Sequence, residues 1–228
     1  MRKLRISIIL SAFALFFICS DIMAQGVSFS YLIPKNGYLS APISPFSIRG
    51  VGIGGRIGAE TGFSLYSIPG LPMNGLPFET DRPISGQGWS ILVPGQLTLS
   101  LKAGNVGIKF LGGGFAILNL STSINKGNLD RALMAYEGWD VATSSINKKT
   151  KPGLGWMAGT EFEFKVNRKF SITAEVEYLS GSYETRINGS YAGGQLGQPI
   201  ASKDLNFDNA KTLLEGIEIS LGVKMGGK

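Results

Sequence analysis

Residues 154–178 read LGWMAGTEFEFKVNRKFSITAEVEY, and apolar and polar side chains alternate on both sides of the segment 167–169. Phe162, for example, stands between Glu161 and Glu163. Successive side chains of a strand point to opposite faces, so each half predicts one strand with an apolar and a polar face. Two such strands joined by three residues predict an antiparallel hairpin.

The same alternation covers most of the chain. Further strands are predicted at 27–33, 89–102, 106–111 and 217–225. The stretch 48–66 also alternates, but it is long for one membrane crossing of roughly 9–11 residues. A two-residue turn at Gly54-Gly55 would divide it and bring the total to eight strands. Otherwise the total would be seven, and single-chain bacterial barrels have even numbers.

The connections alternate between short and long. Gly104-Asn105 joins two strands directly, whereas the connections near 68–88, 120–153 and 185–212 are long and polar. In the longest, Asn128 is expected to cap a short helix whose one face would carry Leu129, Leu133 and Tyr136. Short turns on one side and long loops on the other are typical of outer-membrane barrels. We therefore predict an all-β fold, a closed antiparallel up-and-down transmembrane β-barrel of eight strands with long extracellular loops.

The apolar face is expected to contact lipid. Aromatic residues lie near strand ends, as they do at membrane interfaces; they are Trp89, Trp156, Phe170 and Tyr178. The residues predicted to face lipid are Val93, Leu97, Leu99, Phe162, Val176, Ile217 and Ile219. The alternative is a soluble, secreted ligand-binding β-barrel of the lipocalin type, which would line its interior with apolar residues.

The start of the chain has the pattern of a secretory signal. Arg2, Lys3 and Arg5 precede an apolar run over 6–18, and the small residue Ala24 follows. We expect residues 1–24 to be a cleaved signal peptide and residues 25–228 to form the barrel. Removal would take away Cys19, the chain's one cysteine, and leave no disulfide.

Composition argues against several functional classes. The chain has 22 Lys and Arg against 16 Asp and Glu, and residues 1–24 hold three of the bases and one of the acids, so the remainder carries about +4. No basic stripe with interleaved aromatics indicates nucleic-acid binding. Histidine is absent, which excludes a Ser-His-Asp site and makes a zinc site improbable. We therefore expect no enzyme activity, no catalytic residue, no cofactor and no metal.

A glycine-rich motif precedes one of the predicted turns. Residues 50–55 (GVGIGG) match G-x-G-x-x-G, but a dinucleotide site needs a helix to follow, and Arg56 to Tyr66 alternate with period 2. Small residues in a tight barrel or turn explain the motif better.

The polar faces of the strands predict a charged lumen. Its expected members are Arg56, Glu60, Lys102, Lys109, Glu161, Glu163, Lys165, Glu175, Glu177, Glu218 and Lys224. Charges of both signs in so narrow an interior predict a salt-bridged plug, and loss of Glu163 or Glu175 is expected to lower stability. Paired carboxylates such as Glu161 and Glu163 could instead serve acid–base catalysis, and a narrow pore or transporter for small hydrophobic molecules is a further alternative.

The pattern resembles the small outer-membrane β-barrel proteins of the OmpA/OmpX/OmpW-like group, and the Met23-Ala24-Gln25 region resembles exports of Bacteroidota. The resemblance implies the cell outer membrane, contact with its lipid, insertion by the outer-membrane assembly machinery, and a structural or interaction role through the extracellular loops. Lys148, Lys149 and Lys151 would lie at the outer rim, where they could contact lipopolysaccharide phosphates.

Overall fold

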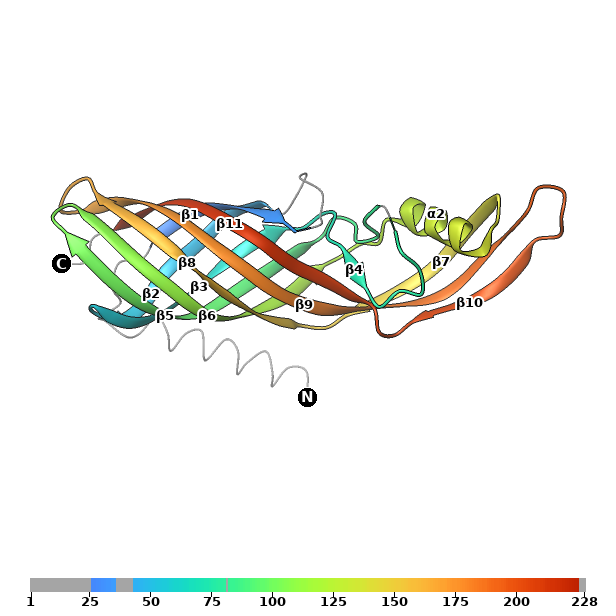
Figure 1. Ribbon diagram of the computed structural model, residues 1–228, viewed down its shortest axis with the longest axis horizontal. Coiled ribbons are helices and arrows are strands. Elements are labelled where there is room, and N and C mark those ends of the chain that lie inside the picture. The colour runs from blue at the N-terminus through green and yellow to red at the C-terminus, as the bar shows by residue number, and fades with distance from the viewer. Residues whose placement is uncertain (1–25, 36–42, 81, 226–228) are drawn as a thin grey trace.

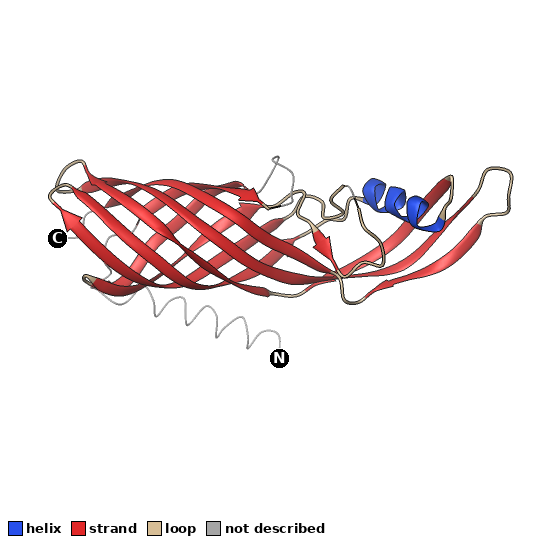
Figure 2. Ribbon diagram, viewed as in Figure 1, coloured by secondary structure: helices blue, strands red, loops and turns tan. Residues whose placement is uncertain are grey.

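The computed structural model describes residues 26–35, 43–80 and 82–225. The expected signal peptide, residues 1–24, lies outside this part of the chain. Antiparallel strand pairing dominates the fold (Figure 2). The strands are β1 (Gly26–Pro34), β2 (Ile43–Gly54), β3 (Ile57–Ser67), β4 (Met73–Asn74), β5 (Trp89–Ala103), β6 (Val106–Ser121), β7 (Val141–Thr150), β8 (Gly153–Lys165), β9 (Phe170–Gly194), β10 (Ala201–Phe207) and β11 (Lys211–Met225), with one helix, α2 (Lys126–Glu137).

Eight of these strands form a closed ring. Neighbours pair in the order β1, β2, β3, β5, β6, β8, β9 and β11, and β11 pairs with β1 to close the sheet. The closing register runs from Gly26 opposite Lys224 to Pro34 opposite Gly216. All pairs in the ring are antiparallel, so the predicted eight-stranded up-and-down barrel is confirmed (Figure 1).

The short turns lie together at one end of the barrel. Two residues separate β2 from β3 and β5 from β6, and four separate β8 from β9. The first turn is Gly55-Arg56, one residue later than predicted, and Gly54 before it has φ 117°. Gly104 also has a positive φ, 61°, which suits a tight two-residue hairpin turn. The glycine-rich motif thus belongs to β2 and its turn, and a strand follows it.

The outer face of the barrel is apolar. Leu97 is 71% exposed and Ile217 45% exposed, and nothing in the described chain covers them. Of the predicted lipid-facing residues, Leu99, Phe162, Val176 and Ile219 are likewise exposed and Val93 is half-buried. Trp156 and Tyr178 contact each other across β8 and β9 with ring centroids 5.5 Å apart. Side chains of this kind exposed over a whole barrel surface are typical of contact with lipid.

A bulge in β2 changes which side chains face inward. The register between β2 and β3 shifts between Ile48 and Val51, and Gly50 has φ 72°. Before the bulge, Arg49 points inward and is 5% exposed; after it, Ile53 points outward. A bulge adds one residue to a strand and therefore reverses its alternation. The uninterrupted alternation expected over 48–66 is wrong at this point.

The long loops contain more regular structure than predicted. β9 has 25 residues, and residues 185–194 continue beyond the barrel, where they pair with β7 on one side and β10 on the other. The connections 120–153 and 185–212, expected to be loops, therefore contribute most of a three-stranded sheet. We call this sheet together with α2 the extension (Figure 1).

The extension has its own apolar core. Helix α2 begins after Asn125, whose side chain accepts a hydrogen bond from the Asn128 backbone amide, so the cap lies three residues before the predicted one. Leu129 and Leu133 are buried as expected, whereas Tyr136 is 53% exposed. The buried members of this core are Ile84, Leu129, Leu133, Ile187, Tyr191 and Leu205. Among the described residues, no helix is long and apolar enough to span a membrane.

Candidate functional site: the barrel interior and its outer rim

The interior is organised in levels along the barrel axis. Along β9 the inward side chains change from Ser171 and Thr173, through Glu175 and Glu177, to Leu179 and then Tyr183. Along β9, the inward face therefore carries hydroxyl groups at the turn end, carboxylates in the middle and apolar side chains at the loop end. Because strand side chains alternate, each level is built from positions two residues apart on neighbouring strands.

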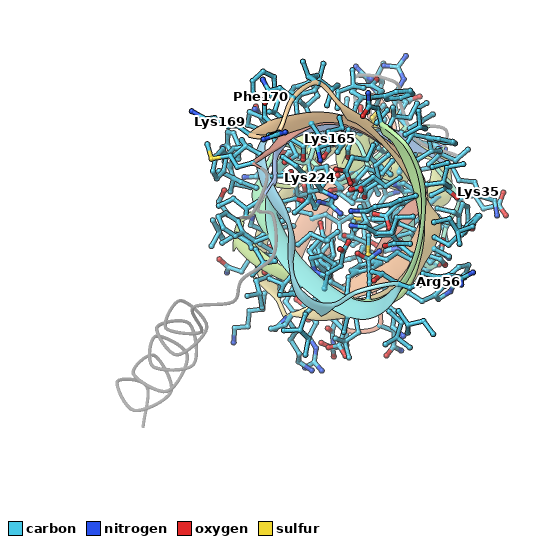
Figure 3. The ribbon with its side chains drawn as sticks, turned by 90° about the vertical axis from the view of Figure 1, so that its left-hand side faces the viewer. Lys35, Arg56, Lys165, Lys169, Phe170 and Lys224 are labelled. Carbon is cyan, nitrogen blue, oxygen red and sulfur yellow. The ribbon has the colours of Figure 1, made fainter. Side chains whose placement is uncertain are left out.

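The turn end holds an open cavity of about 1260 Å³, which we call the vestibule. Its lining comes from the ends of strands near the short turns. Six bases and three acids line it: Arg56, Lys102, Lys109, Lys165, Arg168 and Lys224, with Glu60, Glu161 and Glu163. A view into this end shows Lys165 and Lys224 inside the ring of strands (Figure 3).

A first group of charges closes the inner end of the vestibule. Lys109 Nζ lies 2.8 Å from Glu60 Oε2 and 3.4 Å from Glu161 Oε1, and Lys224 Nζ donates to the same Glu161 oxygen. We call these four residues the Lys109 cluster. Two ammonium groups face two carboxylates, and all four side chains are at least largely buried. This cluster is balanced in formal charge.

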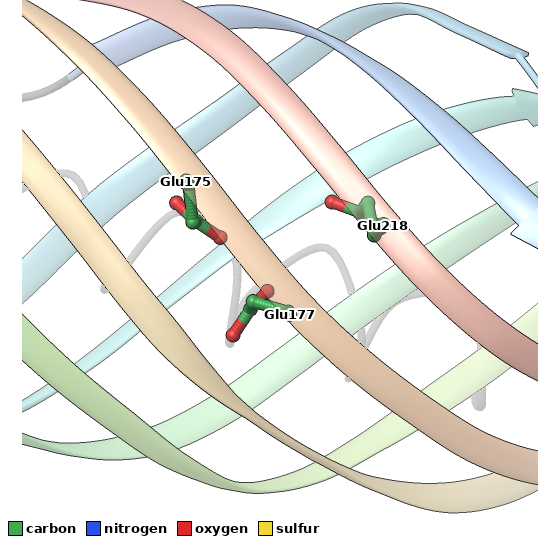
Figure 4. Close-up of side chains that lie close together, drawn as sticks. All are labelled: Glu175, Glu177 and Glu218. Atoms are coloured by element: carbon green, nitrogen blue, oxygen red, sulfur yellow. The ribbon is translucent and has the colours of Figure 1, made fainter.

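The second group lies deeper and contains an excess of acids. Arg49 Nη1 is 3.4 Å from Glu175 Oε1 and 3.2 Å from Glu177 Oε2, and its Nη2 donates to Glu218. These carboxylates come from β9 and β11 (Figure 4). Each of the three is at most 5% exposed.

Neutral donors complete this second group. The Tyr66 hydroxyl donates to Glu218, the Gln96 amide donates to Glu177, and Ser220 Oγ donates to Glu218 Oε1 over 3.0 Å. We call Arg49, Tyr66, Gln96, Glu175, Glu177 and Glu218 the Arg49 cluster. Buried carboxylates are tolerated when charged and neutral donors together satisfy their oxygens.

The same three carboxylates have the spacing of a cation site. One oxygen from each of Glu175, Glu177 and Glu218 lies within 4.8 Å of the others. The Arg49 guanidinium, however, already contacts all three. Arginine presents its donors in a planar fork that suits several carboxylates at once. Arg49 therefore supplies the positive charge that a metal ion would otherwise bring.

Apolar side chains fill the loop end of the barrel. We call this group the apolar plug; its members are Leu32, Tyr66, Ile68, Leu71, Leu92, Phe115, Ile117, Met157, Leu179, Tyr183 and Leu214. Every member is at most 3% exposed. Ile68 and Leu71 come from the connection after β3, which folds back onto the barrel. Tyr66 belongs to both groups, since its ring packs in the plug and its hydroxyl reaches Glu218.

Most of the predicted lumen residues lie inside the barrel, but at different depths. Glu60, Lys109, Glu161 and Lys224 form the Lys109 cluster, while Glu175, Glu177 and Glu218 surround Arg49. Lys102, Glu163 and Lys165 line the vestibule, where Glu163 accepts a hydrogen bond from Ser171 Oγ over 2.9 Å.

Arg56, another predicted lumen residue, lines the vestibule only at its outer edge. It lies in the turn between β2 and β3 and is exposed at the rim, because the turn falls one residue later than expected (Figure 3). Conversely, the sequence missed Arg49, the central cation, since the bulge at Gly50 reverses the alternation that was extrapolated across it. In the sequence, Gly50 beside Arg49 is the feature that could have indicated the bulge. The alternation does not reveal the apolar plug either, because Leu92 and Met157 stand at the strand positions that elsewhere carry polar side chains.

The three rim lysines do not act as one group. Lys149 is the cross-strand partner of Arg186, and Lys151 Nζ lies 2.7 Å from Glu184 Oε2. Lys148 points to the other face of the sheet, opposite the buried Ile187. Its Nζ is buried without a hydrogen-bond partner, and burial lowers the pKa of Lys148 below its usual value. Lys148 is therefore not placed to bind phosphate with Lys149 and Lys151.

Comparison with known proteins gives a likeness of fold. The outer membrane protein OprG from Pseudomonas aeruginosa has a similar structure, with a TM-score of 0.53 and 10% sequence identity; the match covers 90% of this chain and 96% of OprG. A major outer membrane protein from Thermus thermophilus aligns over 89% of this chain and 98% of its own at 10% identity, with a TM-score of 0.38. Neither a protein family nor a curated protein matches the sequence. The chain has the fold of an outer-membrane β-barrel.

Proposed function

We propose that this protein is a small, non-enzymatic barrel of the outer membrane, closed to solutes, that acts through the extension it holds outside the cell. The observation that carries the proposal is the filled interior. The vestibule ends at the Lys109 cluster, and the Arg49 cluster and the apolar plug occupy the barrel beyond it.

The two inner levels block passage for different reasons. The charged side chains bind one another, so a solute would have to break buried ion pairs, each of which leaves an uncompensated charge. The plug is packed apolar material, which excludes water and ions. A solute would have to pass both a charged and an apolar barrier, and neither a polar nor a hydrophobic solute can cross both. This argues against the pore and transporter alternatives.

The chemistry of the interior supports a role without catalysis. The sequence has no histidine, and the described carboxylates of the interior bind arginine, lysine or neutral donors. The extension, in contrast, is a folded module with its own core, joined to the barrel by the unbroken strand β9. A rigid module outside the membrane is suited to contact with other molecules.

Planar-bilayer recording tests the closed interior. The purified protein, shown to be folded by its heat-modifiable migration, is expected to insert without producing conductance steps, in parallel with a known porin recorded under the same conditions. Steady single-channel conductance from the folded protein would overturn the proposal and favour the pore.

A further inference from the structure

A cluster of cations lies on the outer surface where the barrel meets the extension. Glu184 and Arg186 are two residues apart on β9 and therefore share a face. Lys149 is the cross-strand partner of Arg186, and Lys211 is the partner of Glu184. Partners in an antiparallel pair lie on the same face of the sheet. Four cationic side chains, including Lys151, thus surround one acid.

Nearer the short turns, the same face of β9 is the one that contacts lipid. On β9, Val176 and Tyr178 precede Glu184 at intervals of two residues, and Val176 is 45% exposed on the outside of the barrel. Leu154, 75% exposed, stands opposite Ser182, one alternation before Glu184. Two residues of a strand span about 7 Å. The cations therefore begin directly beyond the exposed side chain of Leu154.

The acid does not neutralise the cluster. Glu184 Oε2 is 2.7 Å from Lys151 Nζ and 3.5 Å from Arg186 Nη2, so a single carboxylate is shared between two cations. Arg186 Nε is buried without a hydrogen-bond partner, while Lys149 and Lys211 are exposed. The group keeps a net charge of about +3. It offers arginine and lysine donors on one surface.

We propose that Lys149, Lys151, Arg186 and Lys211 bind a phosphate group of the glycolipid in the outer leaflet. Arginine and lysine are the side chains that recognise phosphate, and a lipid-attached phosphate is held at the height at which these cations begin. The acyl chains of the same lipid would lie against the apolar surface around Leu154. This inference rests on the proposed placement in the outer membrane with the extension outside.

The test compares two double variants that remove one lysine and one arginine each. Lys149→Gln with Arg186→Gln alters the proposed site. Arg168→Gln with Lys169→Gln makes the same charge change at the turn between β8 and β9, on the opposite rim. Binding of diphosphoryl lipid A to the folded proteins in detergent micelles is measured by native mass spectrometry. We expect the first variant to bind roughly 10- to 30-fold more weakly and the second to bind like the unmutated protein.

Further binding measurements identify the ligand. Lipid A without phosphate is expected to bind at least tenfold more weakly to the unmutated protein, and inorganic phosphate is not expected to compete at millimolar concentration. Equal binding by both double variants, equal binding of phosphate-free lipid, or displacement by inorganic phosphate would overturn the proposal. If the first variant does not fold, Lys211→Gln, an exposed position, is expected to weaken binding roughly threefold. Bilayer recordings of the same variants show whether the barrel is closed, independently of whether the cations bind the lipid phosphate.

Discussion

At the scale of single residues, Arg49 is the central cation of the deeper charged group. It contacts three buried carboxylates, and no other cation of the described chain contacts them. Arg49→Met should lower the free energy of unfolding by about 3–5 kcal/mol, because buried carboxylates would lose their counter-charge. Denaturant unfolding in micelles, followed by heat-modifiable migration, measures the change. An unchanged midpoint would contradict the role given to Arg49.

The matched variant at this site is Glu175→Gln. The sequence alone suggested that loss of Glu175 destabilises the barrel, but three carboxylates share one guanidinium. Replacing one of them by an isosteric amide removes excess negative charge, so we expect the midpoint to stay the same or rise. If the unfolding midpoint of Glu175→Gln fell as far as that of Arg49→Met, the negative charge of Glu175 would be required for stability.

A second residue-level prediction concerns the extension. Tyr191 Oη donates to Glu137 Oε1 over 2.5 Å, and Lys203 Nζ donates to Glu137 Oε2 over 2.5 Å. Burial, together with the bond to Glu137, raises the pKa of Tyr191 to about 12. The folded state holds this proton more tightly than the unfolded state, so the stabilisation is complete below pH 10 and is lost as pH rises from about 10 to about 12.

Thermal unfolding of the extension, followed by near-ultraviolet circular dichroism, checks this pH dependence. The melting temperature of the unmutated protein should fall between pH 10 and 12 more steeply than that of Tyr191→Phe. Identical slopes for the unmutated protein and Tyr191→Phe would refute the assignment.

At the scale of elements, the bulge in β2 determines where Arg49 points. Gly50 has φ 72°, a conformation that β-branched residues rarely adopt. Gly50→Val should therefore cost about 1–3 kcal/mol of stability. Gly112→Val on β6 is the control, because a Cβ at Gly112 meets no atom within 4 Å. Urea midpoints of the two variants should differ clearly, and equal midpoints would show that the bulge is not required.

Strand faces were predictable wherever alternation is strong. Leu97 and Phe162 alternate with polar residues and lie on the outside of the barrel. Successive side chains of a strand point to opposite faces of the sheet, so the apolar set shares the outer face. β7 and β10 were not predictable in this way. Along β7 the covered face carries Ala142, Ser144, Ile146 and Lys148, a mixture without a clear apolar period. Its strand state comes from pairing with β9, which local sequence does not encode.

At the scale of the whole molecule, one long strand joins two bodies with different surroundings. The part of β9 in the barrel has an apolar outer face for lipid. The part beyond the barrel is the middle strand of the extension's sheet, between β7 and β10. The closed barrel could be predicted from strand number and turn lengths. The interior could be predicted in part, since its charged residues were identified, while Arg49 and the apolar plug depended on the bulge and on long-range packing.

The orientation of the two bodies across the membrane is the central claim. Single-cysteine variants in a background without Cys19 test it: Leu196→Cys in the extension, 79% exposed, and Lys169→Cys in a short turn. Intact cells are treated with a maleimide attached to a polymer too large to cross the outer membrane. We expect labelling of Leu196→Cys alone, with Lys169→Cys labelled only after lysis. Labelling of Lys169→Cys in intact cells, or protection of Leu196→Cys, would contradict this orientation.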